Sequence, residues 1–299
     1  DNYLYLPGSN AMYFTNKCSS PQLESLIKLH HSNNNFIITE GPDLEEASAL
    51  NKTSDGKLLV FGNKKMQKID PATMTVVNEK AVYTHYNRAI ITDNHEVAAI
   101  GSRSGIVSAY DANLTETRYK ITGINADEGY MNPDNGNYYL ISSSLYNRHS
   151  SLYIMDESNQ LIHSIELGPK LDNVVYNDGY IYVSSNLTAN NYTNQLYIVD
   201  ANTHQLVNTL DISTLSTARL FTSGNYTYLM GDNKILQVQE AQVINTYNTL
   251  SNTQYGDFYY DEPNNTCYFL CSNSSTNSKI FSLDDNSGSF GEIYSMMNN

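Results

Sequence analysis

The amino-acid sequence predicts an all-β fold, a seven-bladed β-propeller in which each blade has four antiparallel strands. Three observations support this prediction: the composition favours strands and turns, one pattern recurs seven times along the chain, and most copies contain four strand-like segments. Repeats of about 40–45 residues with four strands each are typical of propeller blades. Because the copies fill the chain, we expect a single domain over residues 1–299.

The composition suits a protein made of many short strands and turns. Tyr occurs 25 times among the 299 residues, charged residues make up only 16%, and much of the polar content is Asn, Ser and Thr. Tyr, Thr, Val and Ile are enriched in strands, whereas Asn, Gly and Asp favour turns. Hydrophobic residues make up 40% of the chain, which is enough for a large core.

Each repeat contains an apolar strand, a residue that we call the anchor, a short polar turn and a further strand. The anchor is Asp in five copies and another residue in two degenerate copies; in chain order the anchors are His30, Asp70, Asp111, Asp156, Asp200, Gln239 and Asp284, at intervals of 39 to 45 residues. An Asp that starts a tight hairpin can accept hydrogen bonds from nearby backbone N–H groups. We therefore predict that the anchors form turns rather than act in catalysis, with His30-His31 as the substitute in the first turn.

Four strands can be assigned in most copies. In the fifth copy they are residues 173–176, 180–185, 195–200 and 205–210, and their alternation is imperfect, as expected for blades covered on both faces. The predicted blades span approximately residues 1–42, 43–82, 83–123, 124–168, 169–211, 212–251 and 252–299. Each blade contains its own four strands in order, so we expect no strand exchange between the chain ends. The first and last blades would then be joined by side-chain packing or by a covalent link.

The anchor-centred repeats resemble the YVTN family of surface-layer-like β-propellers. The clearest copies are QLYIVDANTHQLVNTLDIS around Asp200 and SLYIMDESNQLIHSIELG around Asp156, and the resemblance covers nearly the whole chain. Members of this family are typically exported or cell-surface proteins. The resemblance therefore implies an extracytoplasmic protein that is secreted, periplasmic or bound to the cell surface. The WD40 pattern is not met, because the chain has no Trp and no Gly-His dipeptide.

The charge of the chain argues against two classes of partner. The net charge is −14, the isoelectric point is about 4.8, and only 17 residues are Lys or Arg. Nucleic-acid binding depends on neutralising phosphates, so we expect no nucleic-acid partner, and an anionic membrane surface is disfavoured for the same reason. No apolar run approaches the ~18–20 residues of a membrane helix, so we expect no transmembrane segment. The chain opens at Asp1 without a recognisable signal peptide, and we expect a processed form.

The three cysteines allow two interpretations. Cys267 and Cys271 lie about 13 Å apart along one predicted strand, at ~3.3 Å per residue, which is too far for a mutual disulfide. Cys18 and Cys271 belong to the first and last predicted blades, which are neighbours in a closed ring. We predict a disulfide between Cys18 and Cys271 if the compartment is oxidising. Otherwise, all three are independent buried thiols.

Two features predict a binding face. The extra residues of the long blades lie between the second and third strands, at 142–150, 184–194 and 271–279, and these connections emerge on one face of a propeller. Polar residues also precede the apolar run of each first strand, where they would ring the mouth of the central channel. The candidate ligand-binding residues are Glu46, Arg88, Glu128, Asn173, Arg219 and Asp257 at the channel mouth and Tyr146, Arg148, His149 and Tyr192 in the long loops. Drift in unconstrained loops and a self-neutralising ring of ion pairs are the structural alternatives.

The favoured function is a non-catalytic binding or scaffold module, such as a cell-surface or adhesive component, with a protein or a small polar ligand on the long-loop face. We expect no catalytic residue, no cofactor and no metal site. One alternative is a lyase or hydrolase that uses the channel-mouth carboxylates with His85 or His149. Another is a structural subunit of a surface assembly. Neither Gly-X-Ser-X-Gly nor His-Glu-X-X-His occurs in the chain.

Overall fold

The computed structural model is built from β-strands in consecutive antiparallel hairpins. It describes residues 3–6, 11–17, 24–32, 35–44, 49–53, 55–62, 65–82, 86–91, 97–101, 106–111, 113–121, 124, 126, 128–132, 134–142, 150–158, 160–186, 194–215, 218–253, 255–261, 264–273 and 277–297. Within these residues the strands form seven sheets, six with four strands and one with three, and each sheet uses strands that are consecutive in the sequence. We number the sheets 1 to 7 in chain order.

Sheets 1 to 3 belong to a first compact unit, which comprises Asp1–Tyr138 and Met155–Gln160. Sheet 1 consists of β1 (Tyr3–Leu6), β2 (Ala11–Lys17), β3 (Glu24–Ser32) and β4 (Asn35–Leu44). Sheet 2 consists of β5 (Ala49–Lys52), β6 (Leu58–Phe61), β7 (Lys65–Asp70) and β8 (Thr75–Ala81). Sheet 3 consists of β9 (Tyr86–Ile91), β10 (Val97–Gly101), β11 (Ile106–Tyr110) and β12 (Glu116–Ile121).

Sheets 5 to 7 belong to a second compact unit, which comprises Tyr139–Ile154 and Leu161–Asn299, and sheet 4 contributes strands to both units. Sheet 4 consists of β13 (Glu128–Met131), β14 (Tyr138–Ser142), β15 (Ser150–Met155) and β16 (Leu161–Gly168). Sheet 5 consists of β17 (Leu171–Asn177), β18 (Tyr180–Ser185), β19 (Gln195–Asp200) and β20 (Leu206–Asp211). Sheet 6 consists of β21 (Arg219–Ser223), β22 (Tyr226–Gln239) and β23 (Gln242–Thr253). Sheet 7 consists of β24 (Tyr255–Asp261), β25 (Thr266–Asn273), β26 (Asn277–Asp284) and β27 (Phe290–Met297).

The three-stranded sheet 6 contains the equivalent of four strands, because β22 folds back on itself. Tyr228 and Gln237 are nine residues apart, which would separate them by about 30 Å in an extended strand. Their side chains nevertheless form a 3.0 Å hydrogen bond. The first part of β22 pairs with β21 and its second part pairs with β23, so β22 supplies both the second and the third strand of the sheet.

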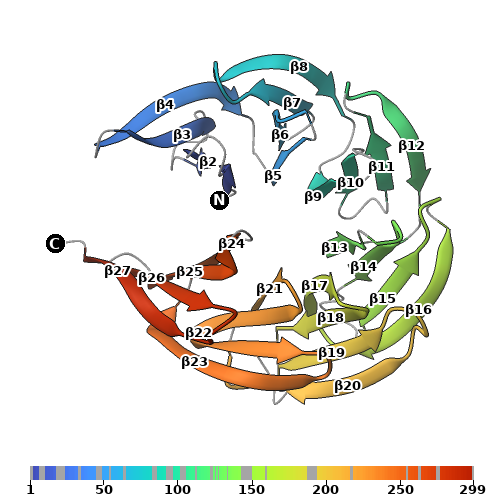
Figure 1. Cartoon of the computed structure of the whole chain (residues 1–299). Helices are drawn as coiled ribbons and strands as arrows, with labels where there is room; N and C mark the ends of the chain where they lie inside the picture. The colour runs from blue at the N-terminus through green and yellow to red at the C-terminus, as the bar shows by residue number, and fades with distance from the viewer. Residues whose placement is uncertain are drawn as a thin grey trace. The chain divides into compact units, whose positions relative to one another are not determined.

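In each unit, the first strands of neighbouring sheets lie side by side at one edge of the sheets, and the fourth strands lie at the opposite edge (Figure 1). The second and third strands are covered on both faces: four consecutive residues of β6 and of β19 are buried. The fourth strands β8 and β20 are exposed or half-buried throughout. The core therefore lies between the faces of adjacent sheets, which explains the imperfect alternation of the sequence.

A β-bulge interrupts the fourth strand shortly after the hairpin in five sheets. The extra residues, inferred from the register shifts, are Val77, Thr117, Val207, Ile244 and Ile293. A bulge places two consecutive residues of one strand opposite a single residue of its partner and increases the local twist. Because the bulge recurs at the same place, it is a property of the repeat.

The structure corrects two sequence predictions. His30 and His31 do not form the turn of sheet 1; they pair with Ile37 and Phe36 inside the β3–β4 ladder, which continues to Ser32. The segment 271–279 is not a long loop either, because β25 and β26 continue pairing to Asn273 and Asn277. In both cases the backbone ladder extends beyond the residues that looked like turn formers.

Candidate functional site

The structure describes only part of the predicted binding face. Glu128 is half-buried at the start of β13, Asn173 is half-buried in β17, and Arg219 is exposed at the start of β21. For Arg88 in β9 and Asp257 in β24 only the backbone is described. Glu46, Tyr146, Arg148, His149 and Tyr192 lie outside the described residues.

Within the second unit, Asn173 and Arg219 lie at corresponding places on adjacent first strands. The Asn173 side-chain amide donates to the Ala218 carbonyl at 3.4 Å and to the Asp172 carboxylate at 2.9 Å. Asn173 therefore bridges sheets 5 and 6 directly beside Arg219. A polar side chain of sheet 5 thus contacts the backbone next to Arg219 at the first-strand edge, while the rest of the predicted face stays a prediction.

The anchor Asp residues cap the hairpins between the third and fourth strands, as the sequence predicted. Oδ1 of Asp200 accepts hydrogen bonds from the backbone N–H groups of Asn202 and Thr203, at 2.9 and 2.7 Å. Oδ1 of Asp284 accepts from Asn286 and Ser287, at 2.8 and 3.1 Å. Equivalent bonds form at Asp70, whereas Asp111 accepts from the second and fourth residues after it and Asp156 accepts from the fourth. The prediction of a turn-forming role is confirmed at all five positions.

The fourth residue after the anchor adopts a left-handed conformation in three of these turns. It is Met74 with φ 57°, His204 with φ 57° and Gly288 with φ 68°. Its N–H donates to the anchor carbonyl in each case, at 2.7 to 2.9 Å. Gly adopts a positive φ without strain, whereas Met and His do so at a cost.

Hydrogen bonds lower the pKa of three anchor carboxyls, Asp70, Asp200 and Asp284. Hydrogen bonds from the backbone of Thr203 lower the pKa of Asp200 below its usual value. Hydrogen bonds from the backbone of Ser287 and Asn286 do the same to the pKa of Asp284, and the bond from Lys57 lowers the pKa of Asp70. Such bonds favour the carboxylate form of the side chain.

A tyrosine on the second strand of three sheets donates its hydroxyl to the third-to-fourth-strand hairpin of the next sheet. Each acceptor belongs to the residue directly after the anchor, 57 or 58 residues from the donor. The three bonds run from Tyr13 to the Pro71 carbonyl at 3.3 Å, from Tyr182 to the Glu240 carbonyl at 2.7 Å and from Tyr228 to Oδ1 of Asp285 at 2.5 Å. We call these residues the clamp tyrosines, because each holds the hairpin of its neighbour.

An asparagine that follows the bulge of the fourth strand makes a second bond between sheets. Asn78 donates to the Asn113 carbonyl at 2.8 Å, and Asn208 donates to the Ala241 carbonyl at 2.9 Å. Both acceptors lie two residues after an anchor. Sheet 5 therefore holds the hairpin of sheet 6 through two neighbouring carbonyls, one bound by a clamp tyrosine and one by this asparagine.

Sheets 6 and 7 share a buried polar network around the Asp285 carboxylate. Asp285 accepts hydrogen bonds from the hydroxyls of Tyr228 and Ser223, at 2.5 and 2.9 Å. Ser223 in turn accepts one from the Cys267 thiol at 3.3 Å, and Gln237 donates to the Tyr228 hydroxyl at 3.0 Å. Burial raises the pKa of the Cys267 thiol to about 12 and also raises the pKa of Tyr228. The thiol is therefore protonated near neutral pH and poorly nucleophilic. The role of the network is structural, because its hydrogen bonds join sheet 6 to sheet 7.

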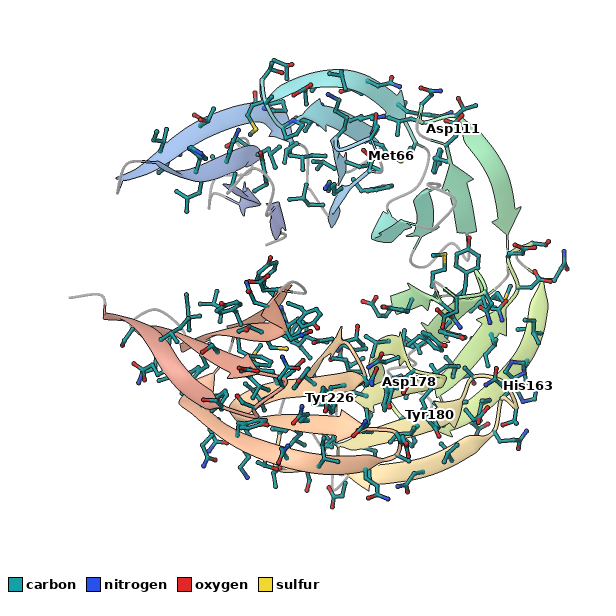
Figure 2. The ribbon with its side chains drawn as sticks, viewed as in Figure 1. Met66, Asp111, His163, Asp178, Tyr180 and Tyr226 are labelled. Atoms are coloured by element: carbon teal, nitrogen blue, oxygen red, sulfur yellow. The ribbon has the colours of Figure 1, made fainter. Side chains whose placement is uncertain are left out.

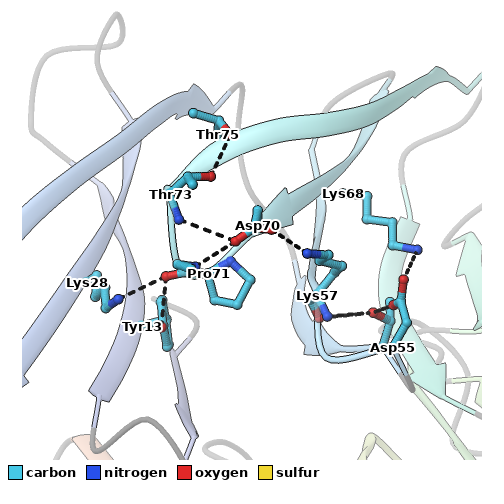
Figure 3. A network of polar contacts seen from close by, with 11 residues as sticks. Tyr13, Lys28, Asp55, Lys57, Lys68, Asp70, Pro71, Thr73 and Thr75 are labelled. Carbon is cyan, nitrogen blue, oxygen red and sulfur yellow. Dashed lines mark hydrogen bonds and ion pairs between the residues drawn. The ribbon is translucent and has the colours of Figure 1, made fainter.

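Ion pairs surround the hairpin of sheet 2 in the first unit (Figure 3). Asp70 pairs with Lys57, and Lys68 pairs with Asp55 at 2.7 Å. Lys28 of sheet 1 donates to the Pro71 carbonyl at 2.9 Å, next to the bond from Tyr13. Asp70 in the β7–β8 hairpin and Asp55 in the β5–β6 turn are thus each paired with a lysine.

The predicted Cys18–Cys271 disulfide stays a prediction, because Cys18 lies outside the described residues. Cys271 is buried, and its Sγ lies 3.7 Å from the Met230 sulfur. Within the described residues, no three His, Cys, Asp or Glu side chains gather closely enough to hold a metal ion. The same residues include no helix with the length and apolar character needed to cross a lipid bilayer.

The bonds between sheets were missed by sequence reasoning, although a weak signal was present. Val-Val-Asn at 76–78, Leu-Val-Asn at 206–208 and Val-Ile-Asn at 243–245 follow three anchors at similar distances. Asn78 and Asn208 reach the next sheet, whereas Asn245 bonds to Gln237 of its own sheet at 2.8 Å. The motif marks the position but does not determine the partner.

Comparison with solved structures supports the propeller class. The chain is similar to Kuenenia stuttgartiensis hydrazine synthase (TM-score 0.70, 13% identity, 99% of this chain and 96% of that chain). It is also similar to a chain of the mitotic checkpoint complex (TM-score 0.68, 13% identity, 93% and 87%) and to the WD40 domain of Toxoplasma gondii coronin (TM-score 0.67, 10% identity, 89% and 76%). No protein-family model and no curated protein matches the chain. The neighbours are β-propeller proteins, so the chain is an all-β protein of the propeller class; at these identities the likeness concerns the fold alone.

Proposed function

We propose that the chain is a single seven-bladed propeller domain of the YVTN type that acts outside the cytoplasm as a non-catalytic binding or scaffold module. Seven consecutive sheets in the described residues support the blade count, and the anchor-centred repeats support the family type. The extracytoplasmic location is supported by the resemblance to exported proteins.

The observation that carries the non-catalytic role is the use made of the reactive side chains. The anchor carboxylates cap turns, Asp285 and the clamp tyrosines join adjacent sheets, and Cys267 is buried as a neutral thiol. These groups rigidify a scaffold. A rigid scaffold that carries variable loops is a common way to build a binding surface.

We place the binding face at the first-strand edge and the connections between second and third strands. Arg219 and Asn173 would bind a polar ligand or a partner side chain there in the second unit, Arg88 would do so in the first unit, and an Arg side chain suits a carboxylate. Tyr146 and Tyr192 would add amphipathic contact area.

The test uses the double variant Arg88→Ala/Arg219→Ala. Wild type, this variant and the matched outer-strand variant Val76→Thr/Val77→Thr are screened against immobilised glycans and synthetic acidic peptides, and urea unfolding checks the fold of each. We expect binding in the wild type and the outer-strand variant, and loss of binding in the arginine variant with unchanged unfolding. Retained binding would overturn the placement of the face. Turnover of a glycan or ester substrate by the wild type would overturn the non-catalytic role.

A further inference from the structure

The fourth strands of the second unit carry a band of exposed aliphatic side chains, which we call the outer band. It consists of Leu161 and Ile162 on β16, Leu206 and Val207 on β20, and Val243 and Ile244 on β23, each 40 to 53% exposed. Single exposed aliphatic residues are ordinary on a protein surface, but pairs that recur at one position of successive sheets are not scattered. In β20 and β23 the pair coincides with the bulge.

Two contacts join the fourth strands of the outer band to the hairpins of the next sheets. The ring of His163, which follows Ile162 on β16 (Figure 2), stacks on His204 in the hairpin of sheet 5 with centroids 5.8 Å apart. Asn208, which follows Val207, bonds to Ala241 in the hairpin of sheet 6. The three aliphatic pairs are thus linked through two hairpins.

Two acidic side chains, Asp200 and Glu240, lie in the hairpins that lead to β20 and β23. Asp200 starts the hairpin that leads to β20, its pKa is lowered by backbone hydrogen bonds, and no Lys or Arg of the described chain pairs with it. Glu240 is exposed in the next hairpin. The equivalent surface of the first unit differs, because Asp70 pairs with Lys57 and Glu79 pairs with Lys65.

We propose that the outer band of the second unit binds an extended polypeptide segment in which aliphatic residues alternate with Lys or Arg. The aliphatic pairs would bury the apolar side chains of the segment, and the unpaired carboxylates would attract its cations. A second copy of the chain suits this surface poorly, because each copy carries a net charge of −14 and the same acidic band. The proposal rests on the proposed function as a binding module and names one class of partner.

The experiment uses a synthetic peptide of alternating Lys and Val, with Lys/Ser and Glu/Val peptides as comparison probes. Binding to the whole chain is measured by fluorescence anisotropy for wild type, Leu206→Thr/Val207→Thr and the matched first-unit variant Val76→Thr/Val77→Thr. We expect the Lys/Val peptide to bind best. Leu206→Thr/Val207→Thr should weaken the affinity for this peptide by about fivefold or more, and Val76→Thr/Val77→Thr should weaken it by less than about twofold.

Equal weakening by the two variants, equal binding of the Lys/Ser peptide, or no binding at all would overturn the proposal. So would a dimer in sedimentation experiments that Leu206→Thr/Val207→Thr abolishes, because it would assign the band to a second copy. If that variant does not fold, Asp200→Asn is tested instead, since it keeps the turn-capping oxygen and removes the charge. Asp200→Asn should weaken the binding of the Lys/Val peptide. The Arg88→Ala/Arg219→Ala variant should bind this peptide normally, which separates this test from that of the first-strand face.

Discussion

At the scale of single residues, a few buried hydroxyl and amide groups hold neighbouring sheets together. Tyr182 and Asn208 bind two successive carbonyls of one hairpin, at Glu240 and Ala241. A carbonyl that loses its donor inside a protein pays the cost of desolvation without compensation. The clamp tyrosines therefore combine a large apolar ring with a directed bond, which suits the space between two packed sheets.

Replacing Tyr182 with Phe should lower the free energy of unfolding by about 1 kcal/mol, because the ring still packs but the bond to Glu240 is lost. Urea unfolding at neutral pH measures the change. Tyr180→Phe is the matched control, since Tyr180 lies on the same strand and its hydroxyl makes no hydrogen bond among the described residues. An equal loss in both variants would contradict the clamp.

At the scale of elements, the hairpin between third and fourth strands is the unit that the repeat conserves in form. It combines an anchor cap, a residue with positive φ and a bulge in the strand that follows. Sheets 4 and 5 also pack closely against each other at the end of β16. A Cβ added at Gly168, the last residue of β16, would lie 2.0 Å from the Tyr197 hydroxyl oxygen of β19.

Gly168→Ala should therefore destabilise the protein by about 1–3 kcal/mol, because Tyr197 is buried and cannot move away without repacking. Thermal unfolding measures the effect. Adding Tyr197→Phe should recover part of the loss, since the clashing oxygen is removed. Gly291→Ala is the control, because its added Cβ meets nothing within 4 Å. A loss at Gly291 as large as at Gly168 would argue against this close contact.

The anchor turns also predict how the free energy of unfolding changes with pH under acidic conditions. Hydrogen bonds from backbone N–H groups hold the folded-state pKa of Asp200 and of Asp284 below the ordinary value of an aspartate side chain. Their stabilising contribution is therefore fully present above the unfolded-state pKa, and it is lost as the pH falls through the lowered folded-state pKa. Asp200→Asn, which keeps the oxygen acceptor but loses the charge, should make unfolding less dependent on pH below about 4 and modestly lower the stability at pH 7. An acid unfolding curve parallel to that of the wild type would contradict this.

At the scale of the whole molecule, the Cys18–Cys271 disulfide in an oxidising compartment stays a prediction from the sequence, which a count of thiols tests. The chain has three cysteines, so protein isolated under oxidising conditions and denatured without reductant should contain one reactive thiol. Three reactive thiols would rule the disulfide out. In the native protein, Cys267 should react slowly with a thiol reagent, because it is buried and its pKa is raised to about 12.

The sequence by itself determined the strands, the repeat and the anchor turns, because these depend on residues close together in the chain. Asp200, for example, caps a turn formed by its next four residues. The sequence prediction was wrong at His30 and His31, which were expected to form a turn. The β3–β4 ladder continues through both residues to Ser32, because backbone pairing extends beyond the position of the anchor.

Only the tertiary structure decided which polar groups meet between sheets. Tyr182 and Glu240 are 58 residues apart, and nothing in either segment specifies the other as its partner. The pairing results from the packing of two sheets, which brings a second-strand tyrosine beneath the neighbouring hairpin. The outer band likewise depends on tertiary structure, because it lies on fourth strands that no further strand of the described chain covers. In β20 and β23 its aliphatic pairs coincide with bulges.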